Sequence, residues 1–225
     1  PLNRDTMTRV WQLDVNGEPS TSRIEQLCLA HTYGSGGDES CENTVRAVEN
    51  LLFGQTVDHY AALSMDAVPI LADLVGGVPV TIDTDMTAVD PRFIEGETVT
   101  LEGELALSYV RARQIVSDGT NQSRMARQEQ FLRAAWEAWM EKTASGDAVE
   151  LGTDALVSLG ERLRSDCTVQ KLSRFLERTE QCELTVLPSP AGEAKISDEN
   201  IAEFYVDDDA LEQTVLELFY REEIS

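Results

Sequence analysis

The sequence predicts an α/β fold, because strand-like and helix-like segments alternate along it. Residues 57–63 and 78–82 are short apolar runs typical of buried strands, and residues 65–74 between them have helical spacing. A strand, a helix and a strand of these lengths predict a right-handed parallel crossover. The 225 residues, 42% of them hydrophobic, are enough for one large core or two small ones.

The chain begins with a predicted hairpin, in which alternating residues from Met7 to Val15 precede the turn signal Asn16-Gly17. Residues 24–33 predict a short helix that stops at Gly34. The glycine-rich residues 34–38 lack the spacing and the lysine of a nucleotide-binding loop, so they predict a turn. From Ser40 a longer helix follows and ends before Gly54. Its predicted buried face consists of Val45, Val48, Leu51 and Leu52.

The middle of the chain combines an acidic loop with two helices. Pro79 places the strand 78–82 at a sheet edge or at a strand start. The acidic residues 83–91 predict an irregular loop that lines or covers a site. A helix over 101–109 and a long amphipathic helix over about 123–142 follow. Their predicted apolar positions are Leu101, Leu105, Ala106 and Tyr109 in the first, and Met125, Leu132, Trp136, Trp139 and Met140 in the second.

The last third predicts helices over about 149–163 and 169–178, then a strand over 183–187. A turn-rich connection leads to a short strand at 202–206. A closing helix spans 207–220, and the acidic residues at its start suit an N-terminal cap.

Composition excludes some classes of function. A net charge of -23 and a pI near 4.3 argue against general binding to nucleic acid or anionic lipid. A local phosphate site remains possible because distant charges are screened. No run of about 18 apolar residues occurs, so no membrane span is expected in these residues. The sequence starts without Met and without an apolar leader, so we expect a processed or excised part of a longer protein.

Four cysteines allow two interpretations. They form no Cys-x-x-Cys pair, and only two histidines accompany them, so a zinc site is not expected. Local disulfides, Cys28–Cys41 and Cys167–Cys182, would suit an exported protein. The alternative is that these cysteines are ordinary buried thiols.

Arginine is concentrated in one stretch of this acidic chain. Of the 18 basic residues, Lys142, Lys171 and Lys195 are the lysines, and four of the arginines lie within residues 111–127. Guanidinium groups form paired hydrogen bonds to phosphate oxygens, so the cluster predicts a phosphate site. Arg124, Arg127 and Gln128 follow helical i, i+3, i+4 spacing and share one face. The alternative is that Arg127 pairs with Glu129 or other surface carboxylates.

Two motifs carry a resemblance to a known family. LEGELALSYVRAR, residues 101–113, followed by SRMARQ, residues 123–128, resembles the signature of the LytR–CpsA–Psr family. Asn3-Arg4-Asp5-Thr6 is similar to the family's Pro-Arg-Asp-Thr element, with Asn3 where proline is usual. Further segments also resemble the family, so the resemblance covers nearly the whole chain. These segments are residues 33–34, 43–45, 48–52, 58–63, 66, 74–78, 191–195 and 204–207.

The resemblance implies a cell-envelope transferase of mainly Gram-positive bacteria. Such enzymes are membrane-anchored and extracellular, and move wall teichoic acid or capsular polysaccharide from undecaprenyl pyrophosphate to peptidoglycan. The implied fold is a three-layer α/β/α sandwich with a mixed central sheet and a hydrophobic lipid tunnel, in one catalytic domain over residues 1–225. Apolar residues of 40–53 and 64–75 become candidate tunnel walls, although periodicity alone predicts core.

The resemblance also implies roles for individual residues. The pyrophosphate would be gripped by Arg4, Arg111, Arg113 and Arg124. Gln128 would lie nearby, and Arg127 would serve as a ligand or as a support. From its local sequence alone, Arg4 is a surface arginine that pairs with Asp5. Guanidinium groups and a magnesium or manganese ion would stabilise charge on the pyrophosphate leaving group.

Two departures from the family pattern concern the metal. An Arg-x-Asp-Thr element of the family, whose aspartate helps to bind magnesium, is expected upstream of this chain, together with the first strands and the membrane anchor. Asn121 stands where an aspartate is common, and Asp118 of the same loop is a candidate substitute. These departures favour an alternative, a non-catalytic polyprenyl-phosphate-binding module. A polyprenyl pyrophosphate hydrolase, in which water replaces the sugar hydroxyl, is a third hypothesis.

Overall fold

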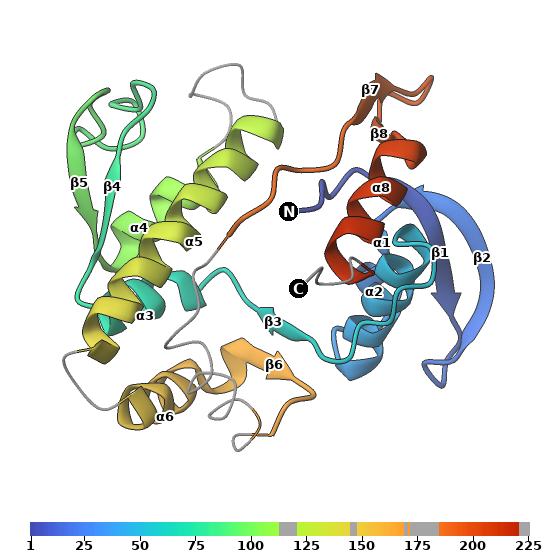
Figure 1. The fold of residues 1–225 in the computed structure, drawn as a ribbon, viewed down its shortest axis with the longest axis horizontal. Coiled ribbons are helices and arrows are strands. Elements are labelled where there is room, and N and C mark those ends of the chain that lie inside the picture. The colour runs from blue at the N-terminus through green and yellow to red at the C-terminus, as the bar shows by residue number, and fades with distance from the viewer. Residues whose placement is uncertain (113–120, 145–147, 169–170, 172–184, 221–225) are drawn as a thin grey trace, which may run out of the picture. The chain divides into compact units, whose positions relative to one another are not determined.

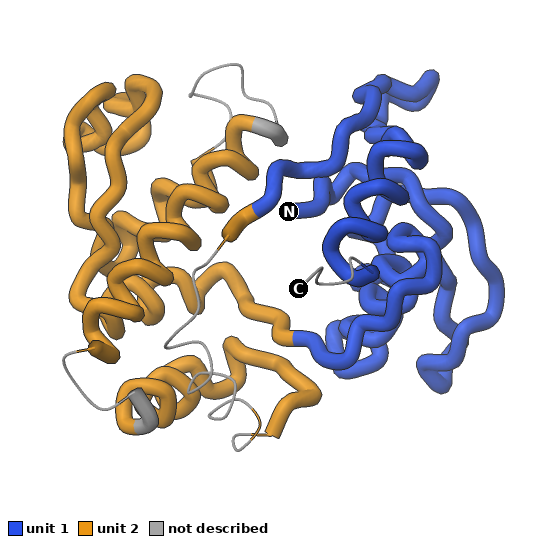
Figure 2. The backbone as a smooth tube through the Cα atoms, viewed as in Figure 1, with its two compact units in different colours: residues 1–60, 187–225 blue, residues 61–186 orange. Residues whose placement is uncertain are grey.

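The computed structural model describes residues 1–112, 121–144, 148–168, 171 and 185–220 (Figure 1). The chain forms two compact units (Figure 2). Unit 1 contains residues 1–60 and 187–225, and unit 2 contains residues 61–186. Unit 1 is therefore built from both ends of the chain. One catalytic domain over residues 1–225 stays a prediction.

The described residues of unit 1 form two antiparallel strand pairs and three helices. In chain order its elements are β1 (Met7–Leu13), β2 (Pro19–Gln26), α1 (Leu29–Thr32), α2 (Asp38–Leu51), β7 (Gly192–Ile196), β8 (Ala202–Val206) and α8 (Asp208–Phe219). The predicted hairpin is confirmed: β1 pairs with β2, and Gly17 in the turn has a φ of 82° that glycine adopts without strain. The predicted helix over 24–33 is shorter, because β2 extends to Gln26.

The core of unit 1 lies between α2 and its neighbours. One cluster joins Val10 of β1 to Ala47 of α2, and a second joins Leu51 to α8. Asn43 is fully buried, and its amide Nδ2 donates to the carbonyls of Trp11 and Ala30, both at 2.8 Å. The buried residues of α2 are Ser40, Cys41, Asn43, Ala47 and Leu51. Of the predicted face, Leu51 is buried, and Val48 and Leu52 are partly buried against the two clusters, whereas Val45 is half-buried and belongs to neither.

The C-terminal prediction is confirmed. β8 spans the predicted residues 202–206, and α8 is capped by Asp207, whose Oδ1 accepts a hydrogen bond of 3.1 Å from the Ala210 amide. Gly192 opens β7, the strand that pairs with β8. Residues 185–187 form no strand, and the rest of the predicted strand 183–187 and most of the predicted helix 169–178 lie outside the described residues.

Unit 2 contains the segments expected to carry the site. Its elements are β3 (Ala61–Leu63), α3 (Ala67–Leu74), β4 (Val78–Thr81), β5 (Thr98–Leu101), α4 (Gly103–Arg111), α5 (Asn121–Ala144), α6 (Ala148–Leu159), a 3-10 turn (Gly160–Arg162) and β6 (Leu163–Ser165). Helices α3, α4 and α5 confirm the predicted helices within a few residues. No helix in the described ranges is long and apolar enough to cross a membrane.

Strand pairing in unit 2 differs from the prediction. β3 pairs with β6 and β4 pairs with β5, both antiparallel, so the predicted parallel crossover from β3 to β4 is wrong. Gly76 and Gly77, at φ 84° and 96°, turn the chain after α3 into β4. Leu101, the predicted start of a helix, instead ends the partner strand β5, and α4 begins at Gly103. β3 is also exposed rather than buried, with Leu63 at 48%.

The strand pairs among the described residues do not join into one larger sheet. They form four two-stranded sheets, with one further parallel bridge between Thr6 and Phe204, so the expected mixed central sheet is not seen among these residues. Pro79 lies in a two-stranded ladder, in agreement with the edge position predicted for it. Mixed helix and strand content supports the α/β class, whereas the sandwich and the lipid tunnel stay predictions.

The core of unit 2 joins β4, β5, α4 and α5 (Figure 1). Tyr109 of α4 and Phe93 are at most 1% exposed, and their rings meet edge to face with centroids 5.5 Å apart. α5 contributes Phe131, which is 3% exposed. The predicted core position Leu132 is wrong, because this side chain is 59% exposed. Small residues Ala134 and Ala135 pack against the core instead.

Cys28 is a free thiol, so the disulfide interpretation is wrong for Cys28–Cys41. Its sulfur accepts a hydrogen bond of 3.2 Å from Nη2 of Arg4. The second predicted disulfide, Cys167–Cys182, is also wrong, because Cys167 is a free thiol; Cys182 lies outside the described residues.

Candidate functional site

The first arginine of the motif ends helix α4. Arg111 is the last residue of that helix and its side chain is exposed, whereas the preceding Tyr109 and Val110 are buried in the core. Because these two side chains fix which face of α4 is buried, Arg111 is directed away from it. A cation in the last turn is also favoured by the partial negative charge of the helix C-terminus.

Side chains from one turn of α5 form hydrogen bonds with the C-terminal end of α4. Nη2 of Arg127 donates to the carbonyl of Ala112, and Nε2 of Gln128 donates to the carbonyl of Val110 at 3.3 Å. The last carbonyls of a helix have no partner within it, so these side chains satisfy groups that would otherwise need water. The tie therefore holds together the two helices that carry Arg111 and Arg124. For Arg127, which the sequence left as ligand or support, the structure shows a supporting contact.

A second link connects α4, α5 and β4. The Tyr109 hydroxyl donates to Oε1 of Gln130, and Nε2 of Gln130 donates to the Thr81 carbonyl at 2.7 Å. Burial, reinforced by the nearby Asp83 carboxylate, raises the pKa of Tyr109 to about 12, although Arg127 acts in the opposite direction. The hydroxyl is therefore neutral at physiological pH and can keep donating to Gln130.

A cavity of about 190 Å³ lies beside this link, within unit 2. Its lining combines the acidic loop with α4 and α5, and consists of Asp83, Thr84, Met86, Tyr109, Ser123, Ala126 and Arg127. The prediction that the loop 83–91 lines a site is consistent with this cavity. Met86 and Tyr109 are buried, whereas Asp83 and Thr84 are exposed, so the loop forms the rim of the cavity.

Arg4 belongs to unit 1, directly before β1. Its Nε lies 3.3 Å from Oδ1 of Asp5, and the same carboxylate oxygen accepts a hydrogen bond of 3.2 Å from Nε2 of Gln26. The Arg4 side chain is 49% exposed and that of Asp5 is 14% exposed. The pairing with Asp5 predicted from the local sequence is therefore confirmed. A shared pyrophosphate site with the arginines of unit 2 stays a prediction.

Some predicted site residues cannot be placed. Arg113 and Asp118 lie outside the described residues. Asn121 is the first residue of α5, but its side chain is outside the described part. Arg124 is half-buried, three residues before Arg127 and on the same face of α5.

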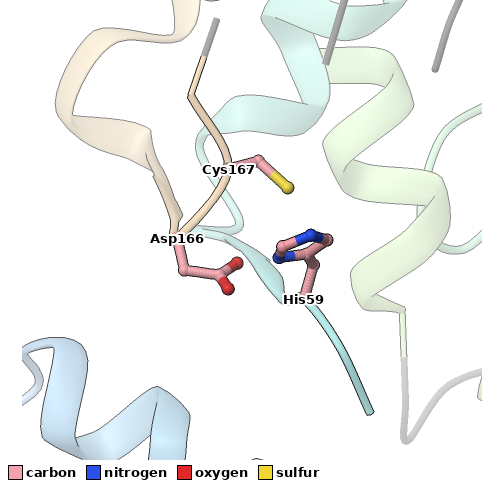
Figure 3. Close-up of side chains that lie close together, drawn as sticks. All are labelled: His59, Asp166 and Cys167. Carbon is pink, nitrogen blue, oxygen red and sulfur yellow. The ribbon is translucent and has the colours of Figure 1, made fainter. Parts of the chain in front are cut away.

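The described residues give little support for a metal centre at the arginines. Among them, no group of three carboxylate, histidine or cysteine side chains gathers beside Arg111 or Arg124. Asp5 is already engaged by Arg4 and Gln26. Asp166 and Cys167, drawn in Figure 3, belong to unit 2, whereas His59 of the same view belongs to unit 1.

Sequence reasoning missed several residues of this region. It did not single out Asp83, Thr84 or Ser123 as site residues, and it placed Tyr109 in the core without its link to Gln130. The acidic loop was the available signal, because irregular polar segments often line sites. Nothing in the local sequence distinguishes Asp83 from the other aspartates of the same loop.

A sequence model of the LytR_cpsA_psr family matches residues 1–218, so the chain belongs to the LytR_cpsA_psr family. It is 26% identical over 181 residues to the polyisoprenyl-teichoic acid–peptidoglycan teichoic acid transferase TagU of Bacillus mycoides, covering 80% of this chain and 53% of the relative. It is 37% identical over 97 residues to the cell wall biosynthesis protein LcpA of Corynebacterium glutamicum, covering 42% of this chain and 18% of LcpA. The chain thus spans about half the length of its TagU relative.

Solved structures show the same fold. The crystal structure of B. subtilis TagV superposes with a TM-score of 0.68 at 22% identity, covering 95% of this chain and 80% of TagV. A structure from Enterococcus faecalis, described as a transcriptional regulator, superposes with a TM-score of 0.71 at 19% identity, covering 96% of this chain and 74% of that one. At these identities the likeness establishes the fold alone.

Proposed function

We propose that this chain is a cell-envelope transferase that moves a glycopolymer from a polyprenyl-pyrophosphate carrier to peptidoglycan. The observation that carries the proposal is the tie between α4 and α5, because it holds Arg111 and Arg124 on adjoining helix ends. The name of the TagU relative describes transfer of teichoic acid to peptidoglycan, which is the same class of reaction. Wall teichoic acid or capsular polysaccharide is the proposed polymer, at the extracellular face of the membrane.

The chemistry follows from what guanidinium groups do. Breaking a pyrophosphate bond leaves negative charge on the departing phosphate, and fixed donors stabilise that charge without having to reorient. Arg111 and Arg124 extend from helices that the unit 2 core holds in place, so they meet the need for fixed donors. The proposed acceptor is a sugar hydroxyl of peptidoglycan. Dependence on magnesium or manganese is a further proposal, and no step is assigned to the metal.

The test is a transfer assay with this chain, a polyprenyl-pyrophosphate-linked glycopolymer and peptidoglycan fragments. Cleavage of the pyrophosphate and labelling of the peptidoglycan are followed in parallel, with magnesium or with a chelator. Arg111→Ala and Arg124→Ala should each lower transfer by about 100-fold or more, as loss of one transition-state donor does in other enzymes. Arg92→Ala is the matched control, because Arg92 is exposed and paired with Asp90.

The possible outcomes distinguish a transferase from a hydrolase and from a non-catalytic lipid-binding module. Transfer that is lost in the two variants but kept in Arg92→Ala supports the transferase. Cleavage without transfer, even with acceptor in excess, indicates a hydrolase. Lipid binding with neither reaction indicates a non-catalytic module, and normal transfer by Arg111→Ala and Arg124→Ala would place the phosphate site elsewhere.

A further inference from the structure

Strand β2 of unit 1 has one edge that no strand among the described residues covers. β2 pairs with β1, and these two strands form a sheet of their own in the described part of the chain. In Figure 1, β2 lies at the margin of unit 1, beside β1. An uncovered strand edge presents unpaired backbone N–H and C=O groups, so it can accept a further strand.

The hydrogen bonds to β1 show which residues of β2 face the uncovered edge. Leu27, the residue directly after β2, donates its backbone N–H to the carbonyl of Thr6 at 2.7 Å. Because bonding residues alternate along an antiparallel pair, the odd-numbered residues of β2 bond to β1. The backbone groups that point away from β1 belong to Ser22, Ile24 and Gln26.

One end of this edge carries the features that usually block the addition of a strand. Pro19 begins β2, and the register with β1 shifts between Gln12 and Leu13, opposite that end. From Ser22 onward β2 has neither a proline nor a register shift, and the side chain of Ile24 is 58% exposed. Residues 22–26 are therefore the part of the edge that can pair.

The charges of β2 indicate which strand fits there. Arg23 and Glu25 are the charged residues of β2, so the strand is neutral in a chain with a net charge of -23. If two copies pair antiparallel about a twofold axis at Ile24, Arg23 of each copy lies opposite Glu25 of the other. An axis at Arg23 or at Glu25 would instead oppose like charges, so the charges favour Ile24 as the centre.

Both charged side chains can take part in this pairing. No ion pair engages Arg23 within the described ranges, and Glu25 uses one carboxylate oxygen to accept from the Tyr33 hydroxyl. The backbones of Arg23 and Glu25 bond to β1, so between two β2 strands they occupy the positions without backbone hydrogen bonds, where opposed side chains lie closest. An axis at Ile24 thus gives two cross-strand ion pairs and brings the two exposed isoleucines together.

The net charge of the chain opposes association only at long range. At physiological ionic strength charges are screened beyond about 8 Å, and the two facing strands are neutral. An interface made by one short strand from each copy is small, so we expect a weak and reversible dimer.

We propose that β2 is a self-association edge, which pairs antiparallel with β2 of a second copy of this chain about a twofold axis at Ile24. The proposal adds a partner in unit 1 and does not depend on the chemistry proposed for the arginines of unit 2.

The first test follows sedimentation velocity and amide hydrogen exchange of the whole chain at increasing concentration. A dimer should appear as the concentration rises, and the amides of Ser22, Ile24 and Gln26 should become protected with it. The amides of Arg23 and Glu25 should be protected at every concentration, because they bond to β1. A chain that stays monomeric, or a dimer that leaves the Ile24 amide unprotected, would overturn the proposal and leave this edge to a strand of another protein.

The second test uses Ile24→Pro, which removes a backbone N–H that points away from β1. Proline is tolerated where the N–H is not needed by the sheet, so the circular dichroism spectrum should be unchanged while the dimer is lost. A dimer of undiminished affinity in folded Ile24→Pro would show that another surface forms it. If Ile24→Pro fails to fold, the charge variants described next decide the question.

The third test exchanges the charges of β2. Arg23→Glu should raise the dissociation constant of the dimer by about tenfold or more, because both cross-strand pairs become repulsive. Adding Glu25→Arg to this variant should restore the affinity, since the two charges then face each other in the reverse order. Arg92→Glu makes the same change in net charge at an exposed side chain of unit 2 and is the matched control. Equal weakening by Arg23→Glu and Arg92→Glu, or no recovery in the exchanged variant, would contradict the proposed pairing.

Discussion

The two units hold their candidate arginines in different ways. In unit 2, Arg127 and Gln128 bind the carbonyls at the end of α4, and both helices cover a core that contains Phe93, Tyr109 and Phe131. In unit 1, Arg4 precedes β1, is half exposed and contacts Asp5 and Cys28. Arginines that stabilise a transition state must be held in a fixed geometry, and the contacts in unit 2 provide this better than those of Arg4 in unit 1.

The units also differ in how their cores are built. Among the described residues, the core of unit 2 is one cluster that includes two aromatic rings in contact, whereas unit 1 has two small clusters and a buried amide, that of Asn43, which links β1 to α1 beside the first cluster. Packing therefore dominates the stability of unit 2, and a polar link contributes more of the cohesion of unit 1.

Phe93→Ala should lower the free energy of unfolding by about 3–5 kcal/mol, because it removes a fully buried ring and leaves a cavity against Tyr109. Leu51→Ala in the smaller cluster of unit 1 should cost about 2 kcal/mol, at the lower end for such changes. Urea unfolding followed by circular dichroism measures both. Equal losses of unfolding free energy in the two variants would mean that packing stabilises the two units to the same extent.

Asn43→Ala should cost about 2–3 kcal/mol, because the carbonyls of Trp11 and Ala30 each lose a buried donor. Gln130→Ala also removes a donor from a carbonyl, that of Thr81, but Thr81 is exposed and water can replace the amide. Its expected cost is about 1 kcal/mol. The same unfolding measurement compares the two variants, and a larger loss in Gln130→Ala would show that the polar link matters more in unit 2.

Tyr109 should make the stability of unit 2 depend on pH at the alkaline end. Its pKa in the folded chain is about 12, above the ordinary value of 10, so folding favours the protonated hydroxyl. This contribution is complete below about pH 10 and is lost as the pH rises from about 10 to 12. Unfolding midpoints across that range should fall less steeply in Tyr109→Phe than in the unchanged chain. Parallel slopes would show that Tyr109 ionises normally.

Arg4→Ala should change the free energy of unfolding by no more than about 1 kcal/mol, because its ion pair with Asp5 is half exposed. Under the proposed function it should nevertheless weaken binding of polyprenyl pyrophosphate. Arg9→Ala is a suitable control, because Arg9 lies in β1, only five residues after Arg4, and hydrogen-bonds Ser22. Lipid binding that is equal in the two variants would remove Arg4 from the predicted pyrophosphate site.

Much of the local structure was predictable from the sequence. Asn16-Gly17 specifies the hairpin turn, Asp207 specifies the start of α8, and the spacing of residues in 101–128 identifies the family. These features depend on residues close together in the chain, because turns, helix caps and short motifs are formed by neighbouring residues.

Tertiary structure decided the partners of these elements. Whether β4 pairs with β3 or with β5 depends on the whole of unit 2, and the helical period alone does not show that α5 buries Phe131 instead of Leu132. The cavity likewise needs residues from the loop after β4 and from α5 to meet, and only the fold brings Asp83 and Arg127 to one site. The first hairpin, helices such as α3, α4, α5 and α8, and the arginine motif thus follow from the sequence, because local interactions encode them. Long-range packing determined which side chains share the site.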